Sequence, residues 1–270
     1  MRQIQHFRFV ARAAVVLTAA AGLSACDVMV NTVHGGRAQA ERVWSRSYTL
    51  DAGGAEVEIV NVNGLISVES TDGNTLDVKA VITARGATEE DAKKVLEKVE
   101  MADEAGSARV RLQAKYAREL GRQGIEVVYT VRAPSSAKLT LGNVNGRVKV
   151  VGAFAALKAE TTNGGVHGEG LRNTVVATTT NGEIKLAMAS MGGDGVALET
   201  TNGSIDLKLP ADVKATLSAR CVNGGIRVTD LPFEKSGEGS RRKLDGAING
   251  GGAAIRLETV NGSIRVGGAT

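Results

Sequence analysis

Proline, cysteine, histidine and aromatic residues are all scarce in this 270-residue chain, which has 3 Pro, 2 Cys, 3 His and an aromatic content of 3%. Two cysteines exclude a disulfide framework of the kind that stabilises small secreted domains. Three histidines leave little material for a His-rich metal site, and we expect neither a metal nor another cofactor. The few aromatic rings argue against a surface that stacks on sugars or nucleobases. The hydrophobic content of 43% is enough for one large core or two small ones.

Residues 1–25 have the pattern of an export signal. Arg2, Arg8 and Arg12 form a basic start, no acidic residue is present, and the apolar run over residues 13–22 is too short to span a bilayer. Without this leader 30 basic residues face 29 acidic ones, so the formal charge falls from +4 to about +1. The pI of 9.1 is therefore no indication of a nucleic-acid partner.

The leader ends in Leu23-Ser24-Ala25-Cys26, which resembles the lipobox of bacterial lipoproteins. The resemblance implies that Cys26 becomes a lipidated N-terminus and that its acyl chains hold the protein on a membrane. The alternative is a plain secretory signal, cut nearby, with Cys26 incidental. Asp27 resembles the inner-membrane retention signal of enterobacterial lipoproteins. We therefore expect a lipoprotein of the bacterial cell envelope that faces the periplasm, at the inner rather than the outer membrane.

Residues 26–46 are expected to form a lipid-anchored tether, because they contain Gly35-Gly36 and no apolar period. Arg37, Arg42 and Arg46 either contact anionic headgroups or belong to a solvated linker. The rest of the chain, residues 47–267, is expected to be one repeat domain.

An Asn-Gly pair recurs seven times, each time preceded by Thr or Val and followed, two residues after the Gly, by Ile or Val. The pairs are Asn63-Gly64, Asn145-Gly146, Asn163-Gly164, Asn181-Gly182, Asn202-Gly203, Asn223-Gly224 and Asn261-Gly262. From Asn145 onward the spacings are 18, 18, 21, 21 and 38 residues, the last about two periods. Periods of this length are typical of stacked units.

Around each pair, apolar and polar residues alternate. The residues three past the Asn are Ile66, Val148, Val166, Ile184, Ile205, Ile226 and Ile264. The residues four before it are Ile59, Leu141, Ala159, Ala177, Leu198, Ala219 and Leu257. A period of two predicts a strand on each side of an Asn-Gly corner.

Both corner residues tolerate a positive φ at low cost. Asn-Gly also suits a two-residue hairpin, which would make neighbouring strands antiparallel. We favour a parallel β-solenoid, because the same residue types recur at the same place in every period and like then stacks on like. The asparagines are expected to form a ladder with a Thr column beside it. Cys221 replaces a Thr in that column and is interpreted as a packed small residue rather than a redox thiol.

Residues 89–101 are expected to form one helix, capped by Thr88 and stabilised by acidic residues in its first turn. We expect this helix to pack on a sheet made by residues 74–84, 107–116 and 124–133. The predicted fold class is therefore all-β, a parallel β-solenoid with one short helix in its N-terminal half.

The order of these features resembles that of the bacterial putative-adhesin family, a domain of unknown function. The resemblance covers about residues 47–267 and rests on the early Asn-Gly, the helix, the Tyr-Thr-Val-Arg-Ala-Pro stretch (129–134) and the serial Thr-x-Asn-Gly-x-Ile coils. It implies a solenoid fold, and some relatives look like parts of envelope-stress systems. The family supplies no catalytic residue set.

Parallel β-helices that cut acidic polysaccharides need several carboxylates on one outer face. With coils stacked in chain order, no two neighbouring coils place carboxylates in the same column. The best candidate for a catalytic cluster is Glu169 and Glu183 near His167. The alternative interpretation of these residues is a solvated face of mixed charge. No catalytic and no metal-binding residue is predicted.

Two features could serve binding. The loop over residues 231–246 is either a disordered insertion or a docking loop. The last coil, with Ile264 and Val266, would expose apolar core at the end of the stack unless a loop, such as residues 231–246, folds over it or another chain stacks there. We expect weak self-association through this C-terminal coil.

The function we expect is a non-enzymatic, adhesin-like or scaffold protein that binds an unidentified envelope protein or glycan, with a link to the envelope-stress response. The alternatives are a carbohydrate-active β-helix enzyme that acts on envelope or extracellular polysaccharide and a purely structural stalk.

Overall fold

The computed structural model describes residues 28–34, 37–117, 119–120, 124–192, 194–238 and 240–269. The leader, Cys26 and Asp27 lie outside the described residues.

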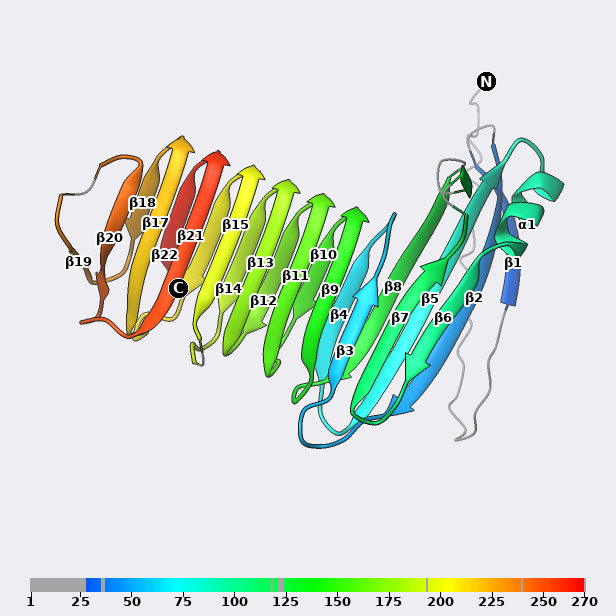
Figure 1. Ribbon diagram of the computed structural model, residues 1–270, viewed down its shortest axis with the longest axis horizontal. Coiled ribbons are helices and arrows are strands. Elements are labelled where there is room, and N and C mark those ends of the chain that lie inside the picture. Colours follow the sequence, from blue (N-terminus) through cyan, green and yellow to red (C-terminus); the bar gives the residue numbers. More distant parts are fainter. Residues whose placement is uncertain are drawn as a thin grey trace, which may run out of the picture.

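Among the described residues, two sheets of eleven strands each lie face to face and enclose the core (Figure 1). In spatial order, the first sheet, sheet A, contains β1 (Val28–His34), β2 (Arg37–Thr49), β5 (Thr75–Gly86), β8 (Ile125–Pro134), β4 (Ile66–Thr71), β10 (Val148–Val151), β12 (Val166–Leu171), β14 (Ile184–Met188), β16 (Ile205–Leu209), β22 (Ile264–Gly268) and β18 (Ile226–Thr229). Sheet B contains β19 (Phe233–Lys235), β20 (Lys243–Ile248), β17 (Ala215–Asn223), β21 (Ala253–Asn261), β15 (Val196–Asn202), β13 (Thr174–Asn181), β11 (Ala156–Asn163), β9 (Lys138–Asn145), β3 (Glu56–Val60), β7 (Arg109–Lys115) and β6 (Glu100–Ala105).

Seven coils of the stack each consist of one strand of sheet B, an Asn-Gly corner and one strand of sheet A. Neighbouring coils pair in parallel and in register, so that Val148 lies beside Val166 and Asn145 beside Asn163. The predicted parallel β-solenoid is confirmed, and the hairpin alternative within a repeat is excluded for these coils.

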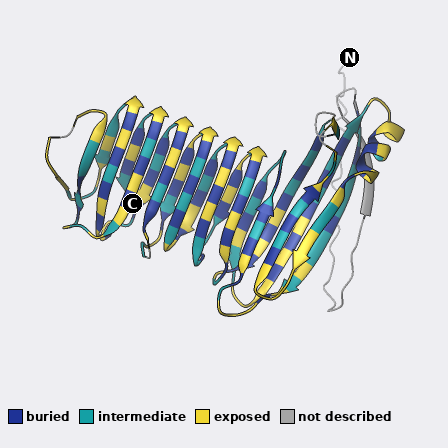
Figure 2. Ribbon diagram, viewed as in Figure 1, coloured by how far each residue is buried: buried dark blue, intermediate teal, exposed yellow. Residues whose placement is uncertain are grey.

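The alternation of apolar and polar residues predicts which side chains are buried. Figure 2 shows the buried and exposed bands crossing every strand of the stack. Six of the seven residues three past the Asn are fully buried, and Ile226 is half-buried because it belongs to the coil at the end of the stack. Burying one such side chain contributes about 1.5–3 kcal/mol, which offsets the ordering of the chain.

The order of coils in space differs from their order in the chain. The last coil, β21 and β22, lies between the β15–β16 coil and the β17–β18 coil. The C-terminus therefore lies beside the interior of the stack in Figure 1, not at its end. Ile264 and Val266 are fully buried. The expectation that this coil leaves an open apolar end is wrong, and it no longer supports self-association there.

The same exchange of order occurs at the other end of the stack. The strands β7 and β8 form a coil without an Asn-Gly corner, and this coil lies outside β3 and β4. Sheet A continues beyond β8 through the antiparallel strands β5, β2 and β1. The stretches 74–84, 107–116 and 124–133 do not share one sheet, because β7 belongs to sheet B.

The helix α1 (Glu89–Glu97) begins at Thr88, whose side chain accepts a hydrogen bond from the Asp91 N–H. It packs on β5 and β2 through Ala92, Val95 and Leu96, all buried. It ends four residues earlier than predicted, because Glu100 already lies in β6.

Part of the expected tether belongs to the domain. Residues 37–49 form β2, which pairs with β5 from Ala38 to Thr49. Ala38, Ala40 and Trp44 are buried, and Arg42 donates a hydrogen bond to the Val99 carbonyl. Small alanines and an inward arginine conceal the period of two, which is why the sequence suggests a linker.

The loop over residues 231–246 is folded over the end of the stack. It forms β19 and the start of β20, and β20 pairs antiparallel with β17. The Cys221 N–H donates a hydrogen bond to the Arg242 carbonyl, and the Ile226 N–H donates one to the Arg241 carbonyl. The loop therefore covers the β17–β18 coil.

No helix in the described part of the chain is long and apolar enough to cross a membrane.

Candidate functional site

The corner asparagines form a continuous ladder of side-chain hydrogen bonds along one edge of the stack. Each Asn donates from Nδ2 to Oδ1 of the Asn in the coil before it in space, over 2.7–2.9 Å. In spatial order the ladder runs through Asn63, Asn145, Asn163, Asn181, Asn202, Asn261 and Asn223. It begins on the main chain, where Asn63 donates to the Ile125 carbonyl at 3.2 Å.

A second column of hydrogen bonds lies just inside the ladder. The buried threonines Thr161, Thr179, Thr200 and Thr259 each donate from Oγ1 to the corner glycine carbonyl of the neighbouring coil, over 2.8–3.2 Å. Asn143 and Asn61 occupy this column in the earlier coils and donate to the carbonyls of Gly64 and Val127. The two columns hold every corner at a fixed place.

Cys221 stands in this column in the coil at the end of the stack. Its Sγ lies 3.9 Å from the Arg241 carbonyl oxygen, and burial raises the pKa of its thiol. A buried thiol with a raised pKa is poorly nucleophilic, which agrees with its interpretation as a packed residue.

Close stacking, rather than backbone conformation, explains most of the corner glycines. A Cβ on Gly203 would lie 1.8 Å from the Gly182 carbonyl oxygen, and one on Gly164 would lie 1.9 Å from that of Gly146. Neither residue has a positive φ. The explanation of Asn-Gly through positive φ is therefore wrong for these corners.

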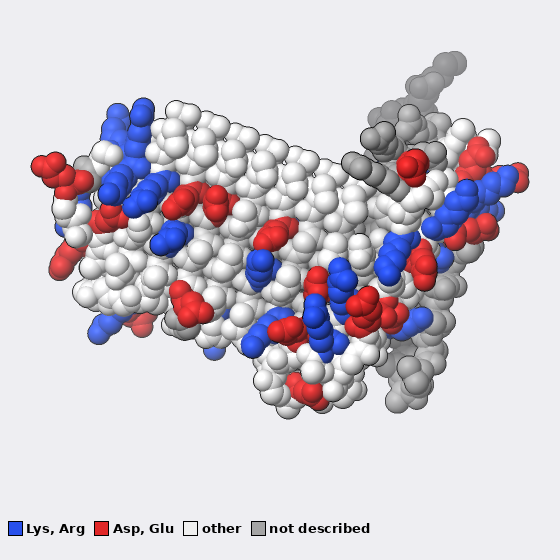
Figure 3. Space-filling model, viewed as in Figure 1, with Lys and Arg blue, Asp and Glu red and all other residues white. Residues whose placement is uncertain are grey.

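One side chain per corner points outward beside the ladder. In spatial order these are Val62, Val144, Thr162, Thr180, Thr201, Val260 and Val222. Together with the seven ladder asparagines we call them the ladder edge. Val144, Val260 and Val222 are 40%, 40% and 54% exposed, the largest exposures of big apolar side chains among the described residues. Figure 3 shows the top edge of the stack as a straight row of uncharged residues.

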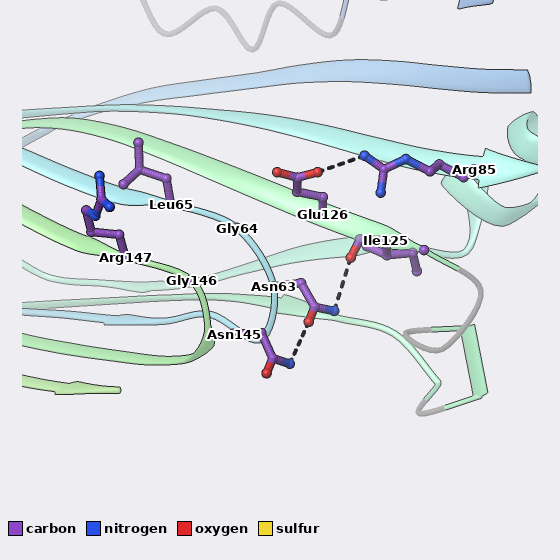
Figure 4. Close-up of a pocket in the computed structure, with 10 residues that line it drawn as sticks. Asn63, Gly64, Leu65, Arg85, Ile125, Glu126, Asn145, Gly146 and Arg147 are labelled. Atoms are coloured by element: carbon purple, nitrogen blue, oxygen red, sulfur yellow. Dashed lines mark hydrogen bonds and ion pairs between the residues drawn. The ribbon is translucent and has the colours of Figure 1, made fainter. Parts of the chain in front are cut away.

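A cavity of about 510 Å³ lies where the ladder begins (Figure 4). Asn63, Asn145 and the corner glycines line one side of it, and Arg85 and Glu126 line the other. The Arg85 guanidinium pairs with the Glu126 carboxylate at 3.1 Å, and Arg147 adds a second guanidinium. Amide, carboxylate and guanidinium groups thus surround one opening, an arrangement suited to a polar ligand.

The sequence did not indicate this cavity. Arg85 and Glu126 lie on β5 and β8, which are far apart in the chain and carry no repeat.

Of the expected cluster, the structure brings two residues together. The Nε2 atom of His167 lies 2.8 Å from the Oε1 atom of Glu183 on the outer face of sheet A. Glu169 makes no ion pair with a described residue. No group of three or more His, Cys, Asp or Glu residues in the described part of the chain could hold a metal ion.

The true coil order overturns the analysis of the carboxylate columns. Because the last coil lies next to β15, Glu199 and Glu258 are register neighbours on the outer face of sheet B, followed by Arg220. Two neighbouring coils therefore do place carboxylates in the same column.

Residues 55–267 match the family described as Toastrack DUF4097. The chain belongs to this family. The match begins just before β3 and ends within β22, so it includes every Asn-Gly corner. No curated protein matches the chain.

Several solved structures are similar to this Toastrack chain at low sequence identity. A putative cell adhesion protein from Clostridium sporogenes is 12% identical, with a TM-score of 0.46 over 83% of this chain and 99% of its own. A putative adhesin from Bacteroides fragilis is 11% identical, with a TM-score of 0.38 over 84% and 97%. A putative lipid binding protein from Parabacteroides distasonis is 10% identical, with a TM-score of 0.23 over 84% and 97%.

Proposed function

We propose that this Toastrack chain is a non-enzymatic, adhesin-like binding protein of the bacterial cell envelope. Its recognition surface is the ladder edge together with the 510 Å³ cavity at the start of the ladder. The observation that carries the proposal is the ladder itself, which holds an exposed, uncharged row of side chains in fixed positions over seven coils.

The chemistry of the ladder edge favours a repeating, hydroxylated ligand. Each ladder amide uses one N–H and one lone pair within the ladder and keeps the others for a ligand. Thr162, Thr180 and Thr201 add hydroxyl groups, and parallel strands repeat these groups about every 4.8 Å. A rigid array loses little conformational entropy on binding. We therefore propose an envelope glycan as the partner, in preference to a protein.

The proposal is tested by capture of envelope material on immobilised residues 27–270, which retain every described residue. Proteins and glycans captured from a solubilised envelope are both measured. Thr180→Arg places a charged side chain in the middle of the ladder edge and is expected to lower captured glycan at least about tenfold. Thr140→Arg is the matched control, because Thr140 is an exposed threonine on the outer face of sheet B.

Three outcomes contradict this reading. Capture of the same amount of glycan by both variants would show that the ladder edge takes no part in recognition. Capture of one protein without glycan would replace the glycan with a protein partner. No capture by the parent chain would remove the binding function.

We further propose that Cys26 is lipidated and anchors the protein in the membrane, with Asp27 retaining it at the inner membrane. The lipobox at residues 23–26 supports this location. Labelled fatty acid should enter the parent chain and not Cys26→Ser, and separated membranes should show which one carries the protein. A role in the envelope-stress response is part of the same proposal. Deletion of the protein should change the induction of that response, and an unchanged response would argue against it.

The carbohydrate-active enzyme is the second candidate, because Glu199 and Glu258 are neighbours on one outer face. If the chain cleaves envelope polysaccharide, Glu199→Gln or Glu258→Gln should abolish product formation. The combined replacement of His167, Glu169 and Glu183 tests the other outer face in the same assay. If the parent chain forms no product while it captures glycan, the binding function stands and the enzyme is excluded for that substrate.

A further inference from the structure

A second cavity, of about 290 Å³, lies at the end of the stack opposite α1. The cavity lies between β18, the edge strand of sheet A, and the loop after β19, which passes over the β17–β18 coil. Three arginines line it, Arg227, Arg241 and Arg265, and none of its lining residues is acidic.

Strand register places two of these arginines side by side. Arg227 on β18 is the direct neighbour of Arg265 on β22, on the outer face of sheet A. Like charges at neighbouring positions of a sheet repel each other. Asp206 offsets one of them, at 3.3 Å from Arg265, whereas Arg227 forms no ion pair with a described residue.

The third arginine is held at the cavity by its main chain. The Arg241 carbonyl accepts a hydrogen bond from the Ile226 N–H at 3.1 Å. The turn that carries it is fixed by Ser240, whose Oγ accepts from the N–H groups of Arg242 and Lys243. The Arg241 guanidinium forms no ion pair with a described residue, so its donors are available to a ligand.

We propose that this cavity binds a phosphate group through Arg227, Arg241 and Arg265. A guanidinium presents a planar fork of donors that matches phosphate oxygens, and a bound anion would relieve the repulsion between Arg227 and Arg265. The volume of the cavity leaves room for an organic group attached to the phosphate. The same chemistry is found in free phosphate and in phospholipid headgroups. The site uses no side chain of the ladder edge and does not depend on the proposed function.

The test is isothermal titration of the full chain in non-ionic detergent with two soluble probes. Inorganic phosphate represents the free anion, and glycerophosphoglycerol represents the diester headgroup of an anionic phospholipid. We expect saturable binding of at least one probe. Binding of inorganic phosphate alone assigns the site to a free phosphate, and binding of the diester assigns it to a headgroup.

Arg227→Gln and Arg241→Gln are each expected to weaken binding at least about tenfold. Both side chains are exposed and Arg241 holds its turn through the main chain, so both variants should melt like the parent. Arg256→Gln is the matched control, because Arg256 is exposed on the outer face of sheet B, away from the cavity. It should change affinity less than twofold.

Two results would overturn the proposal. One is the absence of saturable binding of either probe. The other is an equal loss of affinity in Arg227→Gln and Arg256→Gln, which would show that overall charge rather than the cavity attracts the anion.

Discussion

The position of the last coil inside the stack can be tested by comparing two isoleucines that occupy the same place in neighbouring coils. Ile264 on β22 lies between Ile205 and Ile226 and is fully buried. Ile226 on β18 has one neighbouring coil and is half-buried. If coils followed chain order, these environments would be reversed.

The expected magnitudes follow from burial. Truncating a fully buried Ile to Ala costs about 2–5 kcal/mol, from lost burial and from the cavity left behind. Ile264→Ala should lie near the upper part of this range, because β16 and β18 cannot close the gap without leaving register. The partly solvated Ile226 loses less apolar contact on truncation, so Ile226→Ala should cost about 1–2 kcal/mol.

Guanidinium denaturation of the parent and both variants, followed by circular dichroism, measures the two changes in the free energy of unfolding. Val260→Ala is the control, because this side chain is 40% exposed beside the same corner. It should alter stability by less than about 0.5 kcal/mol. An Ile226→Ala variant that loses as much stability as Ile264→Ala, or more, would refute the coil order.

Three further predictions follow from the stacking of the coils. Gly203→Ala places a Cβ 1.8 Å from a carbonyl oxygen and should lower the melting temperature strongly, whereas Gly53→Ala, with nothing within 4 Å, should leave it nearly unchanged. Cys221→Thr supplies the hydroxyl that the other coils use and should stabilise the protein by about 0.5–1.5 kcal/mol in denaturant titrations; a loss of stability would argue against the Thr column. Glu199→Cys combined with Glu258→Cys should form a disulfide on oxidation, seen as a mobility shift, because adjacent strands lie about 4.8 Å apart; failure to cross-link would contradict their pairing.

Much of the fold could be predicted from the period-two pattern. Ile66, Val148 and Ile205 are apolar at the same place in each repeat, and all are fully buried. The Asn ladder and the Thr column likewise follow from like residues stacked on like. These features depend only on which residue types recur at the same place in each repeat, and this recurrence can be observed in the sequence.

The order of the coils could not be predicted in the same way. The coils with corners at Asn202, Asn223 and Asn261 have nearly the same residue types at their corners. The spacing of these corners along the chain therefore does not show which two coils are adjacent. The stability of the arrangement depends instead on how the loop after β18 returns and covers Cys221 and Ile226. The carboxylate pair and both cavities depend on that order or on strands outside the repeat, so the sequence did not indicate them.

The interior position of the last coil has a consequence for the order in which the chain folds. As the chain emerges from the ribosome or the export channel, β17 and β18 appear before the strands that separate them from β15 and β16. For that interval the exposed edge of β15 and β16 offers them a partner that matches their own corner. Native pairing then requires them to leave this edge so that β21 and β22 can enter. Completion of the stack therefore waits for β21 and β22, and pairing of β17 and β18 with β15 and β16 before then would slow folding.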